Sequence, residues 1–273
     1  TKESFFAADW ASYLRLRITY GSAGNIDRSQ SHYPTISLST SPITGLTTAS
    51  LTHAGNPTLR WEQVNTLNIG IDWRLFSNRI RGSIEYYNKH AKDLLGENLM
   101  DPATGVGGSY RINYANLRTQ GWDIQLETEN LRGPLKWSTN MLFNYTANRV
   151  THYNGPEESN VSAAVAQSPV KKGQSVDLVY SLPWYGLNPQ TGYPLIYLNG
   201  EVSDDYNAYY NSLTLSDLVI SGLRVPPYYG SIRNTFRFKG WEVSALFSYE
   251  FGAVFRRSSI GPGQEYVSSP VYH

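Results

Sequence analysis

Four carboxylates occupy polar positions within alternating segments of the chain, and they are the residues best suited to acid–base chemistry: Asp72, Glu85, Glu242 and Glu250. Two carboxylates on one surface can serve as general acid and general base. Arginines lie nearby on the same segments, at positions 74, 79, 81 and 237. This arrangement favours hydrated charges paired with arginine. We therefore predict no catalytic residue, and we predict that the protein is not an enzyme.

Metal and cofactor chemistry finds little support in the residue pattern. Asp204-Asp205 and Glu157-Glu158 offer the oxygen ligands that calcium takes, but no EF-hand-like spacing surrounds them. The five histidines are scattered without zinc spacing, and there is no cysteine for a thiolate site or a disulfide. We predict neither a metal site nor a cofactor, and we interpret the acidic pairs as solvated loop charge.

A tyrosine-rich segment, EVSDDYNAYYN over residues 201–211, is the best candidate for ligand contact. Tyr206, Tyr209 and Tyr210 could stack on sugar rings, because a tyrosine offers an apolar face and a polar tip. Two alternatives remain open, namely packing within an ordered loop and contact with a partner protein. These three tyrosines are the predicted ligand-contacting aromatics.

The segments that would position these residues alternate between apolar and polar side chains. In LNIGIDWRLFSNRIRGSIEYYN, residues 67–88, every second residue is apolar, and the alternation resumes after the turn at 76–78. A two-residue period on both sides of a tight turn predicts an antiparallel hairpin with one apolar face. Residues 121–150 and 231–252 repeat the pattern, and residues 12–20 hold one further alternating strand.

Long irregular connections separate these hairpins. Residues 21–60, 89–118 and 151–229 are rich in turn-forming and polar residues and are predicted to be mostly loop. ISLSTSPI is the only short strand candidate in the first of them. No helical period of useful length is present, so the predicted fold class is all-β.

The composition is compatible with two environments for the apolar face, a protein core and lipid. The 273 residues are 40% hydrophobic, 16% charged and 14% aromatic, with a net charge of +1. This balance provides no basic field for nucleic acid, and no apolar run reaches the roughly 20 residues of a membrane helix. The face therefore packs either on the core of a soluble β-sandwich or against lipid in a transmembrane β-barrel.

Three features favour lipid. Residues 136–148 and 240–252 alternate for about a dozen residues, which is the length of membrane strands rather than of soluble ones. Turns within hairpins are tiny and connections between hairpins are long. Tryptophans and tyrosines gather near both strand ends, as in the aromatic girdles of barrels. We predict that Ile69, Ile71, Trp73, Trp137, Phe143, Trp241 and Phe247 face lipid and that Asp72, Arg74, Glu85 and Glu242 face the lumen.

Specific stretches then resemble one family. In order, they include LRLRITYGSAGN, NPTLRWEQVNTLNIGIDWRLF, NYANLRTQGWDIQLETENLRGPLKW, WYGLNPQTGYPLIY and PPYYGSIRNTFRFKGWEVSALFSYEFG. Together they resemble the barrel of TonB-dependent receptors of the SusC/RagA type over most of the chain. Two departures stand out: Asn188 lies where that family usually has Asp, and RTQGWD at 118–123 differs from its Asn-x-Gly-x-Glu pattern.

The resemblance implies an antiparallel transmembrane β-barrel of about 22 strands, of which this chain would supply roughly eight to ten from the C-terminal half. Residues 1–273 would form part of one TonB-dependent receptor β-barrel domain with long extracellular loops, the plug domain and final strands being absent. The expected location is the outer membrane of a Gram-negative bacterium.

The resemblance further implies import of a large nutrient, a glycan in preference to a peptide. A SusD-like surface lipoprotein would capture it, and TonB, ExbB and ExbD would act through the missing plug. The alternatives are a soluble β-sandwich carbohydrate-binding module and a passive porin or adhesin barrel.

Arginine substitutions on the apolar face test the assignment of the two faces. Ile71→Arg and Phe247→Arg should each oppose membrane assembly by about 2–4 kcal/mol, because lipid does not solvate a charge at mid-strand. Asp72→Asn, on the polar face, should assemble normally. The readout is the amount of full-length receptor in the membrane fraction, and equal behaviour of the two kinds of variant would overturn the assignment.

Overall fold

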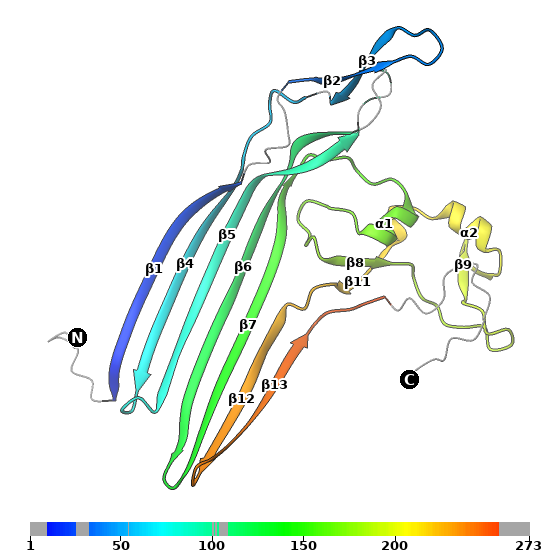
Figure 1. The fold of residues 1–273 in the computed structure, drawn as a ribbon. Helices are drawn as coiled ribbons and strands as arrows, with labels where there is room; N and C mark the ends of the chain where they lie inside the picture. Colours follow the sequence, from blue (N-terminus) through cyan, green and yellow to red (C-terminus); the bar gives the residue numbers. More distant parts are fainter. Residues whose placement is uncertain are drawn as a thin grey trace.

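The computed structural model describes residues 10–25, 33–53, 55–99, 101, 103 and 109–256. Its main feature is one long, curved sheet of seven strands (Figure 1). All neighbours in this sheet are antiparallel. In spatial order the strands are β1 (Ala11–Asn25), β4 (Glu62–Leu75), β5 (Ile80–Leu99), β6 (Ser109–Arg132), β7 (Leu135–Tyr153), β12 (Tyr228–Phe238) and β13 (Trp241–Phe251).

The sheet confirms the predicted class, an antiparallel barrel wall built from long strands. Its strands run from 11 to 24 residues, well beyond the roughly five to six of soluble proteins. Within the described part of the chain, the outer edges of β1 and β13 have no neighbouring strand. Such edges are not tolerated in lipid, so each requires a further strand.

Three tight turns join strands at the lower end of the sheet in Figure 1. In the β4–β5 turn, Phe76, Ser77 and Asn78 all adopt positive φ angles, of 50°, 53° and 64°. In the β12–β13 turn, Lys239 and Gly240 have φ of 46° and 85°. Two successive left-handed residues match the right-handed twist of the flanking strands, which makes such two-residue turns favourable. The β6–β7 turn, at residues 133–134, is equally short.

The opposite end carries the long connections, as predicted (Figure 1). The first forms a hairpin of β2 (Thr35–Thr40) and β3 (Thr47–His53). The connection from β7 to β12, residues 154–227, is termed the outer lobe below. It contains α1 (Val161–Gln167), β8 (Leu178–Ser181), β9 (Ile196–Leu198), β10 (Glu201–Ser203), α2 (Tyr206–Ser212), a 3₁₀ turn (Leu215–Asp217) and β11 (Val219–Leu223).

One predicted loop is wrong. Residues 89–118 were expected to be mostly loop, yet β5 continues to Leu99 and β6 begins at Ser109, with pairing as far as Leu99 opposite Ser109. In β5 the adjacent Leu94 and Leu95 interrupt the two-residue alternation, and in β6 only the short run of Tyr110, Ile112 and Tyr114 keeps it. Register shifts after Ala91 also break the pattern. Residues 100, 102 and 104–108 lie outside the described part of the chain.

The strand count divides between wall and loops. Against the roughly eight to ten predicted, the described residues form seven wall strands and six short ones in the outer connections. The two helices have seven residues each, too short to leave a readable helical period. No helix among the described residues is long and apolar enough to cross a membrane.

A hydrogen bond that crosses Gly230 of β12 links β13 to β7. The Tyr249 hydroxyl of β13 donates to the Leu142 carbonyl of β7 at 2.9 Å, although β12 lies between these strands. It passes over Gly230, where an added Cβ would lie 2.0 Å from the Leu142 carbonyl oxygen and 2.6 Å from the Tyr249 hydroxyl. Any side chain at position 230 would therefore break this crossing.

Gly230→Ala should destabilise the folded receptor by about 1–3 kcal/mol, because a backbone oxygen cannot rotate away from the new methyl group. Gly133→Ala is the matched control, since nothing lies within 4 Å of a Cβ at that position. Denaturant unfolding of the full-length receptor in detergent, followed by its shift on a gel, would measure the difference. Equal midpoints for the two variants would contradict the argument.

Candidate functional site

The strand register separates two faces across the whole sheet. Directly opposed residues in antiparallel strands point to the same side. One such row joins Ile71, Ile84, Ile124 and Phe143 across four strands. The same register places the seven residues predicted to face lipid together on this apolar face: Ile69, Ile71, Trp73, Trp137, Phe143, Trp241 and Phe247.

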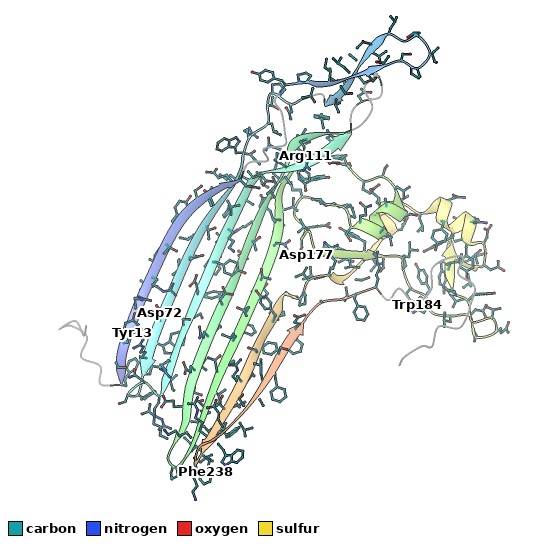
Figure 2. All side chains as sticks on the ribbon, viewed as in Figure 1. Tyr13, Asp72, Arg111, Asp177, Trp184 and Phe238 are labelled. Carbon is teal, nitrogen blue, oxygen red and sulfur yellow. The ribbon has the colours of Figure 1, made fainter. Side chains whose placement is uncertain are left out.

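The polar face carries the four residues predicted to line a lumen, Asp72, Arg74, Glu85 and Glu242. Asp72 lies in the lower half of the sheet in Figure 2. Arg17 of β1 reaches both Asp72 at 2.8 Å and Glu85 at 3.1 Å. Arg15 contacts Asp72 at 2.8 Å as well. These four charges form a cluster that joins β1, β4 and β5, termed the wall cluster.

Further ion pairs continue across the polar face. Arg81 contacts Glu127 at 2.8 Å, and Arg237 contacts Glu242 at 2.6 Å. Arg237 was among the predicted partners of these carboxylates. The partners of Asp72 were not foreseen, because Arg15 and Arg17 lie more than fifty positions away in the sequence and only the β1–β4 register brings them together. Arg74 instead lies 5.3 Å from the ring centroid of Tyr13.

The cluster geometry suits a charged wall rather than acid–base chemistry. Asp72, Glu85 and Glu242 each accept at least one hydrogen bond from an arginine. Each of these carboxylates is thus engaged by a positive charge within the wall. In the part of the chain that the structure describes, no group of three His, Cys, Asp or Glu residues could hold a metal ion.

Asn148 of β7 anchors the outer lobe to the sheet. Its side-chain oxygen accepts from the Ser175 hydroxyl at 2.8 Å and from the Val176 amide at 3.0 Å, and its amide donates to Asp177. The Val150 amide also donates to the Gln174 carbonyl at 2.8 Å. The lobe thus lies beside the upper part of β7, beyond Tyr145, where the pairing with β12 stops at the first residue of β12, Tyr228 (Figure 2).

The three predicted ligand-contacting tyrosines have different environments. Tyr209 is only 6% exposed, and its helix α2 packs against β9, which carries the buried Ile196. Burial raises the pKa of the Tyr209 hydroxyl. Its ring packs inside the lobe and cannot stack on a ligand in this arrangement, which corrects the expectation for this residue. The Tyr206 hydroxyl donates to the Pro194 carbonyl at 2.7 Å, while Tyr210 is 55% exposed.

Other exposed aromatics of the lobe were not singled out as candidate contacts. Trp184 and Tyr193 are both well exposed, and Trp184 lies at the lower edge of the lobe in Figure 2. Nearby in sequence, Tyr185 packs against Tyr197 with ring centroids 4.6 Å apart. The aromatic density of WYGLNPQTGYPLIY could have identified them. Trp184, Tyr193 and Tyr210 form the exposed aromatic surface of the lobe.

The turn at Asn188, where the family usually has Asp, shows why this departure is tolerated. Its side-chain oxygen accepts from the Gln190 amide at 2.9 Å and the Thr191 amide at 3.3 Å, and its carbonyl accepts from Gly192. An aspartate oxygen could accept the same bonds, so Asn serves equally in this turn. Gly192 completes the turn at a φ of 73°. The substitution leaves the loop conformation intact.

A long antiparallel sheet with one apolar and one charged face, tight turns at one end and long connections at the other, defines the wall of a transmembrane β-barrel. The chain belongs to the family of TonB-dependent receptor-like β-barrels, whose family model matches residues 6–261.

Two curated relatives are both receptors of this kind. TonB-dependent receptor P3 of Formosa agariphila is 23% identical over 272 residues, covering 92% of this chain and 27% of that protein. TonB-dependent receptor SusC of Bacteroides thetaiotaomicron is 23% identical over 145 residues, covering 53% of this chain and 14% of that protein. The chain therefore spans about a quarter or less of the length of these relatives.

Solved structures agree on the fold. The RagAB peptide importer in its closed-closed state matches with a TM-score of 0.73 at 23% identity, over 92% of this chain and 28% of that one. Its open-open state matches with a TM-score of 0.74 at 21% identity, over 90% of this chain and 27% of that one.

Arg17→Ala should destabilise the wall more than Arg15→Ala. Arg17 is the only described residue that contacts both Asp72 and Glu85, whereas loss of Arg15 leaves Asp72 with Arg17. Arg15 is also more exposed, with 57% of its side chain accessible against 36%, so water screens its contact more strongly. The heating temperature at which the receptor loses its compact band on a gel should fall by a few degrees for Arg17→Ala and hardly change for Arg15→Ala.

Proposed function

We propose that this chain is part of the barrel wall of an outer-membrane transporter that imports a large nutrient in a TonB-dependent manner. Residues 1–273 form part of one barrel domain in this proposal. The observation that carries it is the two-faced sheet, together with membership of the family. The apolar face contacts lipid, and the polar face with the wall cluster lines the transport path.

Aromatic contacts at both ends of the apolar face support the lipid assignment. Near the tight turns, Trp137 stacks on Phe236 with ring centroids 5.6 Å apart, and Trp241 is 79% exposed. Near the long connections, Tyr86 contacts Trp122 at 5.0 Å. Amphipathic rings favour the two membrane–water interfaces. The tight turns then face the periplasm and the outer lobe faces the outside.

The partners follow from the orientation and the family. A SusD-like surface lipoprotein would cover the end that carries the outer lobe, and TonB with ExbB and ExbD would act through a plug inside the barrel. The host is a Gram-negative bacterium. The ion-paired polar face is consistent with this role, because a wall whose charges are mutually paired presents a polar surface without a catalytic group.

We infer a glycan as the substrate class. The exposed Trp184, Tyr193 and Tyr210 offer apolar ring faces of the kind that stack on sugars. A peptide is the second candidate, favoured by the structural likeness to a peptide importer, although a likeness at this identity speaks for the fold.

Two other functions receive less support. A soluble β-sandwich needs a second sheet against the apolar face, and no described segment forms a sheet large enough to cover it. A passive porin or adhesin barrel does not account for the match to TonB-dependent receptors.

Uptake in intact cells tests the proposal. Cells expressing the full-length receptor should accumulate a fluorescent oligosaccharide mixture, and deletion of TonB should abolish this uptake. Uptake of labelled oligopeptides in place of the glycan would replace the substrate class but keep the transporter. TonB-independent uptake of either would refute the proposed function.

The aromatic surface can be tested separately. Trp184→Ala combined with Tyr193→Ala should lower glycan uptake at limiting concentration by about 30-fold, since each lost stacking contact weakens binding by roughly 1 kcal/mol. Trp61→Ala, an equally exposed tryptophan in the β3–β4 connection, is the matched control and should transport normally. Equal loss in both variants would indicate a general effect on folding rather than ligand contact.

A further inference from the structure

The apolar face changes character just above its upper aromatic row. Asn65, His90, Arg118 and Arg149 lie opposite one another on four adjacent strands. They lie on the apolar face together with Leu67. Asn65 is two residues from Leu67 in β4, and directly opposed residues in neighbouring strands share a face. Lys92, opposite Gln63, continues the same face one step further out.

A cavity of about 350 Å³ lies within this upper band. Its lower part is apolar and its upper part carries polar groups, and its lining comprises Tyr20, Asn65, Leu67, Asn88, His90 and Lys92. Arg118 borders it, because the Arg118 Nε donates to the Asn88 side-chain oxygen at 3.0 Å. We term this cavity with Arg118 the upper pocket.

The cations of the upper pocket lack carboxylate partners. Among the described residues, neither Lys92 nor Arg118 forms an ion pair. On the polar face, by contrast, Arg17, Arg81 and Arg237 each have a carboxylate within 3.1 Å. Nearby acids are engaged elsewhere: Asp93 pairs with Arg60, and Glu62 accepts from the Asn25 side chain and the Leu95 amide. 

Cations at this level of a barrel meet an anionic boundary. The pocket begins where the apolar band ends, so its charges lie at headgroup depth if the apolar face contacts lipid, as proposed above. Basic residues at that depth attract anionic headgroups, and Arg and Lys are well suited to phosphate oxygens. The apolar floor formed by Leu67 and Tyr20 suits the start of an acyl chain.

We propose that the upper pocket binds a phosphorylated glycolipid of the outer leaflet. Lys92 and Arg118 contact its phosphate, Asn65 and His90 hydrogen-bond its sugar hydroxyls, and Leu67 contacts its acyl chain. This ligand belongs to the surrounding membrane and is distinct from the transported nutrient. The proposal rests on the orientation of the wall given under the proposed function, but not on the identity of the substrate.

Lipid binding to the purified full-length receptor tests this. The probe is bis-phosphorylated lipid A added in detergent, with the same lipid after removal of both phosphates as the comparison, and bound lipid is counted by native mass spectrometry. The wild-type receptor should bind the phosphorylated form about 10-fold or more in preference. Lys92→Gln with Arg118→Gln should weaken that binding by roughly 30-fold, taking about fivefold for each basic residue.

A charge-matched control separates the site from overall charge. Lys136→Gln with Arg233→Gln removes two cations from the opposite face of the wall, and it should leave lipid binding unchanged. The temperature at which each variant loses its compact band verifies folding. Lys92→Arg, which keeps the charge, should retain binding.

Three results would overturn the proposal: equal binding of the two lipid forms, equal loss in the two double variants, or competition by millimolar inorganic phosphate as effective as by the lipid. The last would indicate an anion site without lipid specificity. Membrane fractionation tests the orientation on its own, so failure of the lipid site and failure of the proposed function are distinguishable.

Discussion

Pairing of every backbone amide and carbonyl is the constraint on which this structure depends. Lipid offers no hydrogen bonds, so a strand that crosses a membrane must pair on both sides. The long ladders from β1 to β13 meet this requirement, and their register is uninterrupted over the central part of the sheet. Once the register is set, the two-residue period assigns every side chain to one face, so lipid contact, ion pairing and the upper pocket all follow from it.

The ladder also explains how distant parts of the chain cooperate. Asp72 and Arg17 are far apart in sequence but diagonal neighbours across two adjacent strands, and their ion pair staples β1 to β4. Gly230 lets Tyr249 reach across β12 to the Leu142 carbonyl of β7. In both cases a side chain reaches its partner only because the strand register brings that partner beside it.

The outer lobe follows a different principle. It lies beyond the apolar band, where water can satisfy polar groups, and it contains a few buried side chains, such as Tyr180 and Tyr209, and short strand pairs rather than long ladders. Asn148 attaches it to β7 through hydrogen bonds from Ser175 and Val176. The wall therefore provides the scaffold, and the lobe and the upper pocket provide the surfaces on which recognition is proposed.

The sequence by itself determined the wall. Strict alternation in residues 67–88 and 231–252 predicted the hairpins and their apolar faces, because a strand with one face in lipid must repeat every two residues. It also identified the tight turns at the ends of these hairpins. It failed for residues 89–118, which continue as paired strands. There the adjacent Leu94 and Leu95 and the register shifts beside them interrupt the alternation, and the run of Tyr110, Ile112 and Tyr114 is short.

Only the tertiary structure decided which side chains meet. The Arg17–Asp72 pair, the burial of Tyr209, the exposure of Trp184 and the joining of Lys92 with Arg118 depend on strand register and on the packing of the lobe. Sequence spacing within one strand says which face a residue occupies. It does not say which residue on the next strand lies at the same height, since that depends on turn geometry, bulges and chain segments far away in sequence.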